Sequence, residues 1–218
     1  MPYIFNTISL FLFCFFWKRN KQKELRAFII YIFFVAISSW LLALGRHEFK
    51  IINLEELFFL LRISVFCELS ILMYFLYSNF QSSTVRNIIL FLWIVFLPYC
   101  IYDWYINDKN IYSPYPLILA DLLIFTFSLL LLLEKTRIDV GVALHITKIF
   151  WFAIAMMLIS TGLFFMLSFN KTTVNNEDFR NQYRIVFFIL VVSKNILISI
   201  GLLIKEKAVV KLVDDTYI

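Results

Sequence analysis

Long runs of apolar residues alternate with short polar segments along the whole chain. The apolar runs number seven, at residues 2–17, 27–45, 57–77, 87–104, 116–133, 148–169 and 185–204. About 20 residues rising ~1.5 Å each cross a hydrocarbon core, so most of these runs have the length of a spanning helix. The first run is short and carries Asn6, Thr7 and Ser9, so a bundle of six helices stays open as an alternative. The pattern predicts an all-α, polytopic transmembrane helical bundle that forms a single domain over residues 1–218.

The composition and the placement of basic residues agree with a membrane environment. Hydrophobic residues make up 62% of the chain and charged residues 16%, which is far more apolar than an ordinary soluble domain. Lysine and arginine in alternate connecting segments number twelve on one side and six on the other. Because cytoplasmic loops carry the basic excess, we predict an inner-membrane, multi-pass protein with its N-terminus outside and its C-terminus inside. This topology accounts for the net charge of +5 without a nucleic-acid partner; the partner that the composition implies is the lipid bilayer.

Two opposite charges lie near the middle of apolar runs, Glu68 in the third run and Lys194 in the seventh. In this topology both runs pass from outside to inside, so ~1.5 Å per residue places Glu68 about 16 Å and Lys194 about 14 Å below the outer boundary. Charges at the bilayer centre are costly, and we therefore predict that this pair meets inside the bundle. Three interpretations stay open: the pair fixes helix register, it forms a switch that a ligand, proton or partner separates, or the two do not touch.

Further polar residues surround this predicted pair. Arg62 and Asp121 each lie about 7 Å into their runs by the same rise, so they form a second level pair as satellites of the first. Arg62 can instead reach the glutamates at 55 and 56. Ser193 and Asn195 flank Lys194 and add polarity, which predicts a small wet pocket in the bundle.

The residues needed for most enzymatic chemistry are missing from the sequence. His47 and His145 are the only histidines, and the predicted topology separates them across the membrane. No phosphate-binding loop, G-x-S-x-G elbow or H-E-x-x-H motif occurs. Cys14, Cys67 and Cys100 lie in apolar runs without the paired spacing of a metal site. We therefore expect no catalytic residues, no metal site, no cofactor and no enzymatic activity.

Four segments between residues 57 and 204 carry a recognisable pattern. They are CELSILMYFLYSNF, DLLIFTFSLLLLLEK, KIFWFAIAMMLISTGLFF and KNILISIGLLI. Together they resemble small stand-alone seven-helix inner-membrane proteins of Bacteroidetes-type bacteria, which in turn resemble the membrane sensor regions of histidine kinases. The resemblance implies a signalling role. Because the apolar runs leave no room for a kinase domain, such signalling would use a separate cytoplasmic or membrane partner protein.

A lysine in the seventh helix with a carboxylate in the third is also similar to the retinal site of microbial rhodopsins. Lys194 would carry the retinal and Glu68 would be its counterion. However, Leu190 stands where that family has an aspartate one turn before the lysine, and the run at 148–169 contains no proline. We therefore do not expect retinal in this chain.

The sequence as a whole favours a non-enzymatic multi-pass membrane protein that acts as a sensor or as an accessory, regulatory component for a partner. The buried pair of Glu68 and Lys194 would be its polar core. The alternative is an oligomeric channel or a membrane-perturbing effector, such as an accessory protein of a phage-defence or stress system. A pore needs a continuous polar stripe, and Glu68, Lys194 and Asn195 supply only a short piece of one in each subunit. Assembly into a homo-oligomer stays open.

Overall fold

The computed structural model describes residues 2–15, 25–43, 54–106, 114–138, 147–168 and 177–204. Of these, residues 2–3, 42–43, 54–59, 61, 138 and 177–180 are described by their backbone alone. The elements in this part of the chain are α-helices, which confirms the all-α part of the predicted fold class. They are α1 (Pro2–Phe15), α2 (Arg26–Ala43), α3 (Leu54–Asn79), α4 (Ser83–Ile106), α5 (Tyr115–Ile138), α6 (Lys148–Ser168) and α8 (Glu177–Leu203).

Each of the predicted apolar runs corresponds to one of these helices, but α2 to α5 and α8 begin before the apolar run does, by one residue in α2 and α5 and by more in α3, α4 and α8. α4 begins at Ser83 rather than at residue 87. α3 begins at Leu54 rather than at residue 57, and α8 begins at Glu177 rather than at residue 185. The extra residues of α8 are mostly polar, EDFRNQYR. A helix can continue past the apolar region because its hydrogen bonds lie within the helix itself, so the apolar pattern marks the buried length and not the helix ends.

Within the described residues, four helices are long and apolar enough to cross a membrane. These segments are Ser83–Ile106, Tyr115–Arg137, Lys148–Ser168 and Asn181–Leu203. α1 and α2 contain shorter apolar helices, Ile4–Phe15 and Arg26–Leu41. α3 is not among the four, and its apolar run is interrupted by Arg62 and Glu68. By length and composition, then, the chain has the character of a helical membrane protein.

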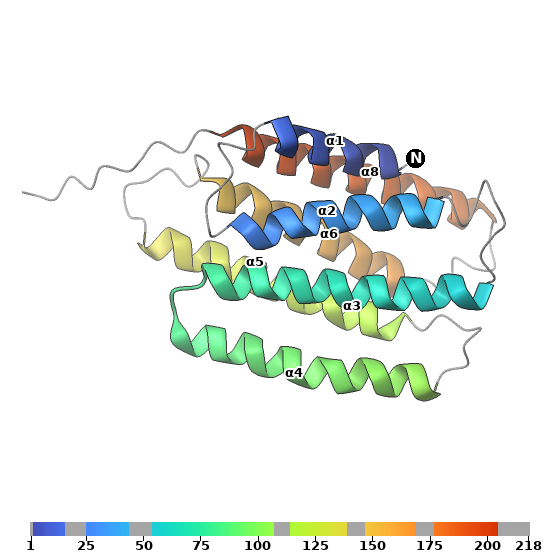
Figure 1. The fold of residues 1–218 in the computed structure, drawn as a ribbon, viewed down its shortest axis with the longest axis horizontal. Helices are drawn as coiled ribbons and strands as arrows, with labels where there is room; N and C mark the ends of the chain where they lie inside the picture. Colours follow the sequence, from blue (N-terminus) through green and yellow to red (C-terminus); the bar gives the residue numbers. More distant parts are fainter. Residues whose placement is uncertain are drawn as a thin grey trace, which may run out of the picture.

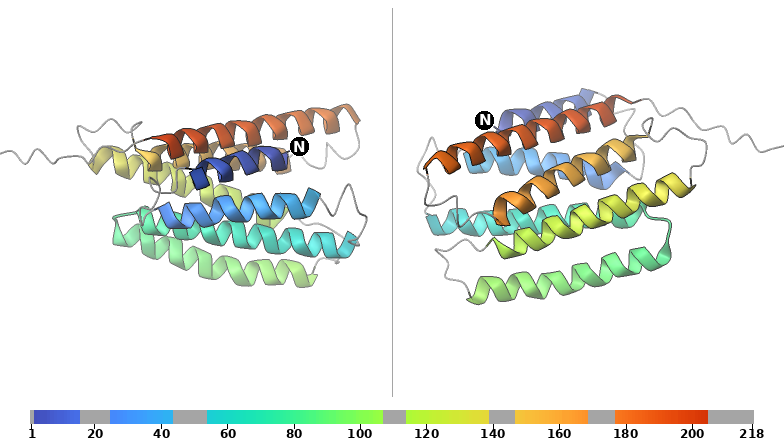
Figure 2. Two further views of the ribbon diagram at one scale, coloured as in Figure 1. Left: turned by 45° about the horizontal axis from the view of Figure 1, so that its top comes forward. Right: turned by 180° about the vertical axis from the view of Figure 1, so that it is seen from behind.

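The helices run side by side along the long axis of the molecule (Figure 1). α1, α2, α3 and α4 form one row, and α8, α6 and α5 form a second row behind it, as the two further views show (Figure 2). Contacts join α1 to α2, α2 to α3, α3 to α5, α5 to α6, α6 to α8 and α8 back to α1. Six helices therefore close a ring, while α4 lies outside it against α3 and α5.

The turn between α3 and α4 is tied to the neighbouring α5. The backbone N–H of Gln81 donates to the Glu134 carboxylate at 2.5 Å. The hydroxyl of Ser82 accepts from the N–H of Val85 at 3.5 Å, as an N-cap residue does for the first turn of a helix. These contacts attach the near end of α4 to the ring.

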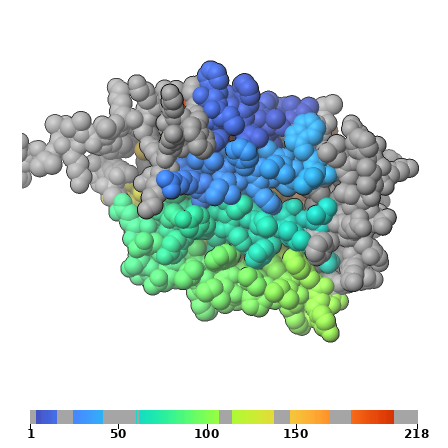
Figure 3. Space-filling view, in the orientation of Figure 1, coloured from blue at the N-terminus to red at the C-terminus, as the bar shows by residue number. Residues whose placement is uncertain are grey.

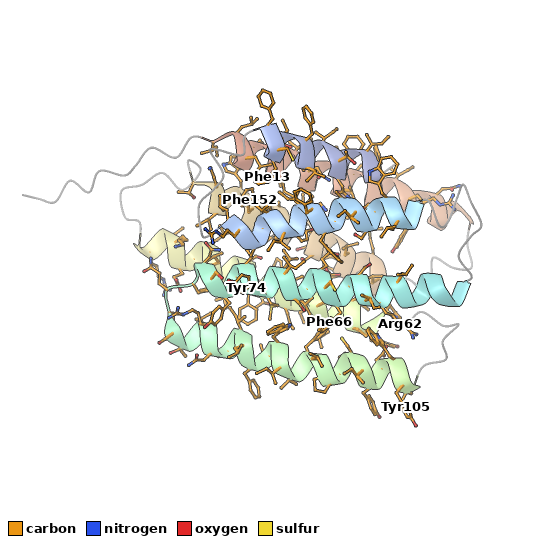
Figure 4. The ribbon with its side chains drawn as sticks, viewed as in Figure 1. Phe13, Arg62, Phe66, Tyr74, Tyr105 and Phe152 are labelled. Carbon is orange, nitrogen blue, oxygen red and sulfur yellow. The ribbon has the colours of Figure 1, made fainter. Side chains whose placement is uncertain are left out.

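The outer surface of the bundle is rich in large apolar side chains. α4 is the clearest case, with Phe91 64% exposed and Tyr105 88% exposed. Figure 3 shows the face formed by α1 to α4, and Figure 4 shows Tyr105 directed away from the bundle. Water-soluble monomers rarely expose contiguous apolar surface on this scale, whereas such a surface suits contact with lipid.

Candidate functional site

The interior of the ring divides into two ends along the helix axes. We call them the aromatic end and the polar end. The aromatic end is formed by Phe13, Phe28, Phe75, Leu131, Phe152 and Leu202. The polar end is formed by Asn6, Ser9, Tyr31, Ser39, Glu68, Asp121, Lys194 and Asn195. The second of these contains the residues that the sequence singled out.

At the aromatic end the rings fill the centre of the bundle. Phe28 of α2 stacks on Phe152 of α6, with ring centroids 4.1 Å apart and planes 12° from parallel. Phe75 of α3 packs against the same Phe28 ring at 5.2 Å. Phe13 of α1 is fully buried nearby, and Figure 4 shows Phe13 and Phe152 toward the same end of the bundle. Aromatic packing thus closes the interior between α2, α3 and α6 at this end.

At the polar end Asn195 of α8 is the centre of a hydrogen-bond network. Its side-chain amide donates to Asn6 at 3.0 Å and to the carbonyl of Val191 at 2.8 Å. Its carbonyl oxygen accepts from Ser9 at 2.6 Å. The amide of Asn6 in turn donates to the hydroxyl of Ser39 at 2.7 Å. The network ties α1, α2 and α8 together, so the polar residues that made the first run doubtful are those that hold α1 in the ring.

The two central charges are joined through a tyrosine. The Tyr31 hydroxyl of α2 donates to Glu68 of α3 at 3.1 Å. Lys194 lies on α8, and its ammonium group is 5.7 Å from the centroid of the Tyr31 ring. The negative charge of Glu68 also acts on Lys194. Among the described residues the structure therefore brings Glu68 and Lys194 into one site through Tyr31, and no direct ion pair joins them.

Sequence reasoning missed Tyr31. Depth along the helix axis compares backbone positions, whereas the phenol ring carries its hydroxyl far from the backbone. An isolated tyrosine in the run 27–45 looks like one more large apolar residue. The usable signal was that a buried tyrosine hydroxyl needs a hydrogen-bond partner, and Glu68 was the nearest carboxylate to supply one.

Asp121 of α5 lies on the other side of Glu68. It is only 4% exposed, and its Oδ2 atom has no hydrogen-bond partner. It lines a cavity of about 30 Å³ together with Tyr31, Glu68 and Ser160. A volume of this size has room for about two water molecules.

The predicted pairing of Asp121 with Arg62 is replaced by a different arrangement. The charged group that acts on Asp121 is Glu68, and Arg62 does not line the cavity. Arg62 is half-buried on α3 (Figure 4). The side chains at 55 and 56, its other predicted partners, lie outside the described residues. Equal depth along two helices does not by itself make their side chains face each other.

A second, smaller cavity of about 10 Å³ lies on the other side of Tyr31. Its lining includes Asn6, Ser9, Lys194 and Asn195. Tyr31 lines both cavities and so forms a wall between the Lys194 side and the carboxylate side. The wet pocket that the sequence predicted is therefore two small spaces. Ser193 is half-buried and lines neither of them.

Metal and thiol chemistry find no support among the described residues. No group of three or more His, Cys, Asp or Glu side chains is placed there to hold a metal ion. The three cysteines are free, with Cys14 exposed, Cys67 half-buried and Cys100 buried. His47, His145 and most of the basic segments used to predict the topology lie outside the described residues.

Comparison of the chain with models of protein families, with curated proteins and with solved structures gave no match.

Proposed function

We propose that this protein is a non-enzymatic, multi-pass sensor or accessory component of the inner membrane, which responds through its polar end. The N-terminus and the polar end would face outside, and the aromatic end would face the cytoplasm. One observation carries the proposal: among the described residues, the two cavities and the hydrogen-bonded groups around Tyr31 and Asn195 lie toward the polar end, whereas the Phe28–Phe152 stack fills the bundle at the other. Asn79 and Lys148, which are buried near the aromatic end, line neither cavity. An interior with polar groups and cavities at one end and close aromatic packing at the other suits the binding of a stimulus better than the passage of an ion.

The contacts of Tyr31 supply the element with two states. Its hydroxyl binds Glu68 on α3 and its ring faces Lys194 on α8, so it couples helices on opposite sides of the ring. A stimulus that removed the charge of Glu68 or Lys194 would weaken both contacts and leave the other charge buried without compensation. Such a charge is costly in the membrane, so the bundle would shift toward an arrangement that solvates it.

The response would leave the protein at the aromatic end. α3 and α8 both end there, and both carry partners of Tyr31 in their middle turns. Rotation of either helix about its long axis would also turn its last turn, beside which a cytoplasmic or membrane partner protein can bind. The partner is proposed from this geometry together with the resemblance to sensor regions of histidine kinases.

The test is a measurement of helix movement in the full-length chain. Spin labels at S78C and L203C, both exposed near the last turns of α3 and α8, report the separation of these helices in lipid nanodiscs once the native cysteines are replaced by alanine. Tyr31→Phe removes only the hydroxyl that binds Glu68. We expect it to add a second distance population. The matched control is Tyr74→Phe on α3, where the side chain is 59% exposed (Figure 4), and it should leave a single population.

Two results would contradict the proposal. If Tyr31→Phe and Tyr74→Phe both reproduce the wild-type distance distribution, Tyr31 does not hold a second arrangement in check. If the purified protein conducts ions across liposomes at a rate that Phe152→Ala increases, the aromatic end is the gate of a pore. In that case the channel alternative replaces the sensor.

A further inference from the structure

Two carboxyl groups share the larger cavity, and no cation is among its described lining residues. Glu68 and Asp121 both line it, and the negative charge of Glu68 acts on Asp121. One oxygen of Asp121 is buried and has no hydrogen-bond partner. A buried carboxylate oxygen is costly unless a cavity water or a proton satisfies it. The side chains around the cavity do not supply that partner.

The charges that face this cavity can be counted helix by helix. α3 contributes Glu68, α5 contributes Asp121, and α8 contributes Lys194 from behind the Tyr31 wall. α2 contributes the neutral Tyr31 hydroxyl. The lining residues of α6 are Ile159, Ser160 and Leu163, none of which ionises. Two negative groups against one positive group leave one negative charge, so one added positive charge makes the site neutral.

We propose that this cavity binds a single proton, held between Asp121 and Glu68, and that the proton is the stimulus of the sensor. The inference rests on the proposed function for its biological meaning. A proton satisfies the orphan oxygen directly, since a protonated Asp121 becomes a donor toward Glu68 or a cavity water. A metal ion fits less well, because the described residues offer no third acidic, histidine or cysteine ligand.

The position of Asp121 makes proton exchange with water feasible. It lies six residues from Tyr115 at the start of α5, which is about 9 Å along the helix. The proton would arrive from water at the polar end and leave by the same path, because aromatic packing fills the other end. With the proton shared, Glu68 becomes a weaker acceptor for Tyr31 and a weaker counter-charge for Lys194. Proton binding would then favour release of the Tyr31 contacts.

The test uses dicyclohexylcarbodiimide, an apolar reagent that adds to protonated carboxyl groups and leaves a stable acylurea on the side chain. The full-length protein in nanodiscs is treated over a range of pH and analysed by peptide mass spectrometry. We expect the label on Asp121 or Glu68, with yield that falls as pH rises and with loss of the label to background in Asp121→Asn and Glu68→Gln together. Asp103→Asn, which removes a buried carboxyl on α4 outside the cavity, should leave the label unchanged.

Infrared difference spectra between acidic and alkaline samples detect a protonated carboxyl group even where the carbodiimide cannot reach the cavity. A proton on Asp121 or Glu68 gives a carboxylic acid C=O band that disappears in the same double variant and persists in Asp103→Asn. If neither the label nor the band is found, the proposal is wrong. If the label is found but sodium ions suppress it at constant pH, the site binds sodium in competition with the proton, and the proposal that the proton is the stimulus is wrong.

These outcomes separate the proton site from the proposed switch. If the label depends on pH but Tyr31→Phe leaves the spin-label distances unchanged, the proton site is supported and the proposed switch is wrong. If Tyr31→Phe adds a second distance population but neither the acylurea label nor the carboxylic acid band is found, the switch is supported and the proton site is wrong.

Discussion

The polar end and the aromatic end of the same bundle are held together in different ways. At the aromatic end, rings from α1, α2, α3 and α6 are buried against one another. At the polar end, amide, hydroxyl and charged groups contact across α1, α2, α3 and α8, and two cavities remain. Lipid tails are as apolar as the helices, so helix association in a membrane depends on close packing and on interhelical hydrogen bonds. This bundle uses the two means at separate ends.

The separation has a mechanical meaning. Close-packed interiors resist change because side chains interlock in one arrangement, whereas a polar site with cavities can exchange one set of hydrogen bonds for another. We therefore expect the aromatic end to be the more stable part of the bundle and the polar end to be the part where the response begins. Substitutions that exchange the character of the two ends test this expectation.

The largest effect is expected from Lys194, the one cation among the described residues that line the two cavities. Lys194→Met leaves Glu68 and Asp121 without this compensating charge. Breaking a direct buried ion pair costs about 3–5 kcal/mol, and because Tyr31 lies between Lys194 and Glu68 the expected loss is at most this large. Adding Glu68→Gln should recover a large part of the loss. The free energy of unfolding in detergent checks both. Lys135→Met, at the end of α5, is the control and should change little; an equal loss in Lys135→Met and Lys194→Met would argue against the central site.

The next effect tests the aromatic end alone. Phe152→Ala removes one ring of the stack with Phe28, and a buried Phe→Ala substitution costs about 3 kcal/mol or more in soluble proteins. The cavity part of that cost remains in a membrane. Phe165→Ala on the same helix removes a ring that is 55% exposed and serves as the matched control. Similar unfolding free energies for the two variants would show that the stack does not fix this end.

Two glycines allow the packing of the two ends to be compared, because an added methyl group at either one would crowd its neighbours. At Gly201 an added methyl group would lie 2.6 Å from the Phe152 ring, which the stack with Phe28 holds in place. At Gly162 the nearest atoms are the two methyl groups and the Cγ of Leu190, a half-buried side chain that can rotate away. Overpacking costs about 1–3 kcal/mol when the neighbour cannot move. We expect Gly201→Ala to destabilise the protein more than Gly162→Ala in thermal unfolding, and the reverse order would contradict a rigid aromatic end.

The smallest effect is expected from the hydrogen-bond network of α1. Asn195→Leu removes the contacts of Asn195 with Asn6 and Ser9, and interhelical hydrogen bonds in membranes average about 0.6 kcal/mol each. A loss of about 1 kcal/mol follows, with α1 becoming more accessible to proteases. Trp40→Phe, which removes one exposed hydrogen bond to Thr7, should cost about half as much. No change in either variant would mean that packing alone holds α1.

The sequence predicted the elements of this fold better than their faces. Apolar length identified each described helix, because in lipid the backbone hydrogen bonds must lie within the segment. The depth argument located Glu68 and Lys194 in one region, since rise per residue is constant in a helix. It did not reveal Tyr31 between them or the proximity of Asp121 to Glu68, because these depend on helix rotation.

Rotation was unpredictable here for a physical reason. Helices that are apolar on all sides carry little amphipathic signal to show which face turns inward, and α5 and α6 are of this kind. The polar residues that do fix rotation, such as Asn6 and Asn195, act through partners far away in the sequence. Their pairing requires knowledge of which helices are neighbours, and the order of helices in the ring is a property of the whole bundle.

The closure of the ring between α1 and α8 has a consequence for biosynthesis. Asn6 and Asn195 are 189 residues apart in the chain, yet they are hydrogen-bonded to each other. On the ribosome α1 is made before α8, and the amide of Asn6 must wait in the membrane until the helices between them have been translated. The aromatic contacts of α2 and α3 can form long before then. Assembly would therefore end at the network of Asn195, and a nascent chain stalled before α8 would present the polar groups of α1 to whatever membrane-inserted chaperone attends it.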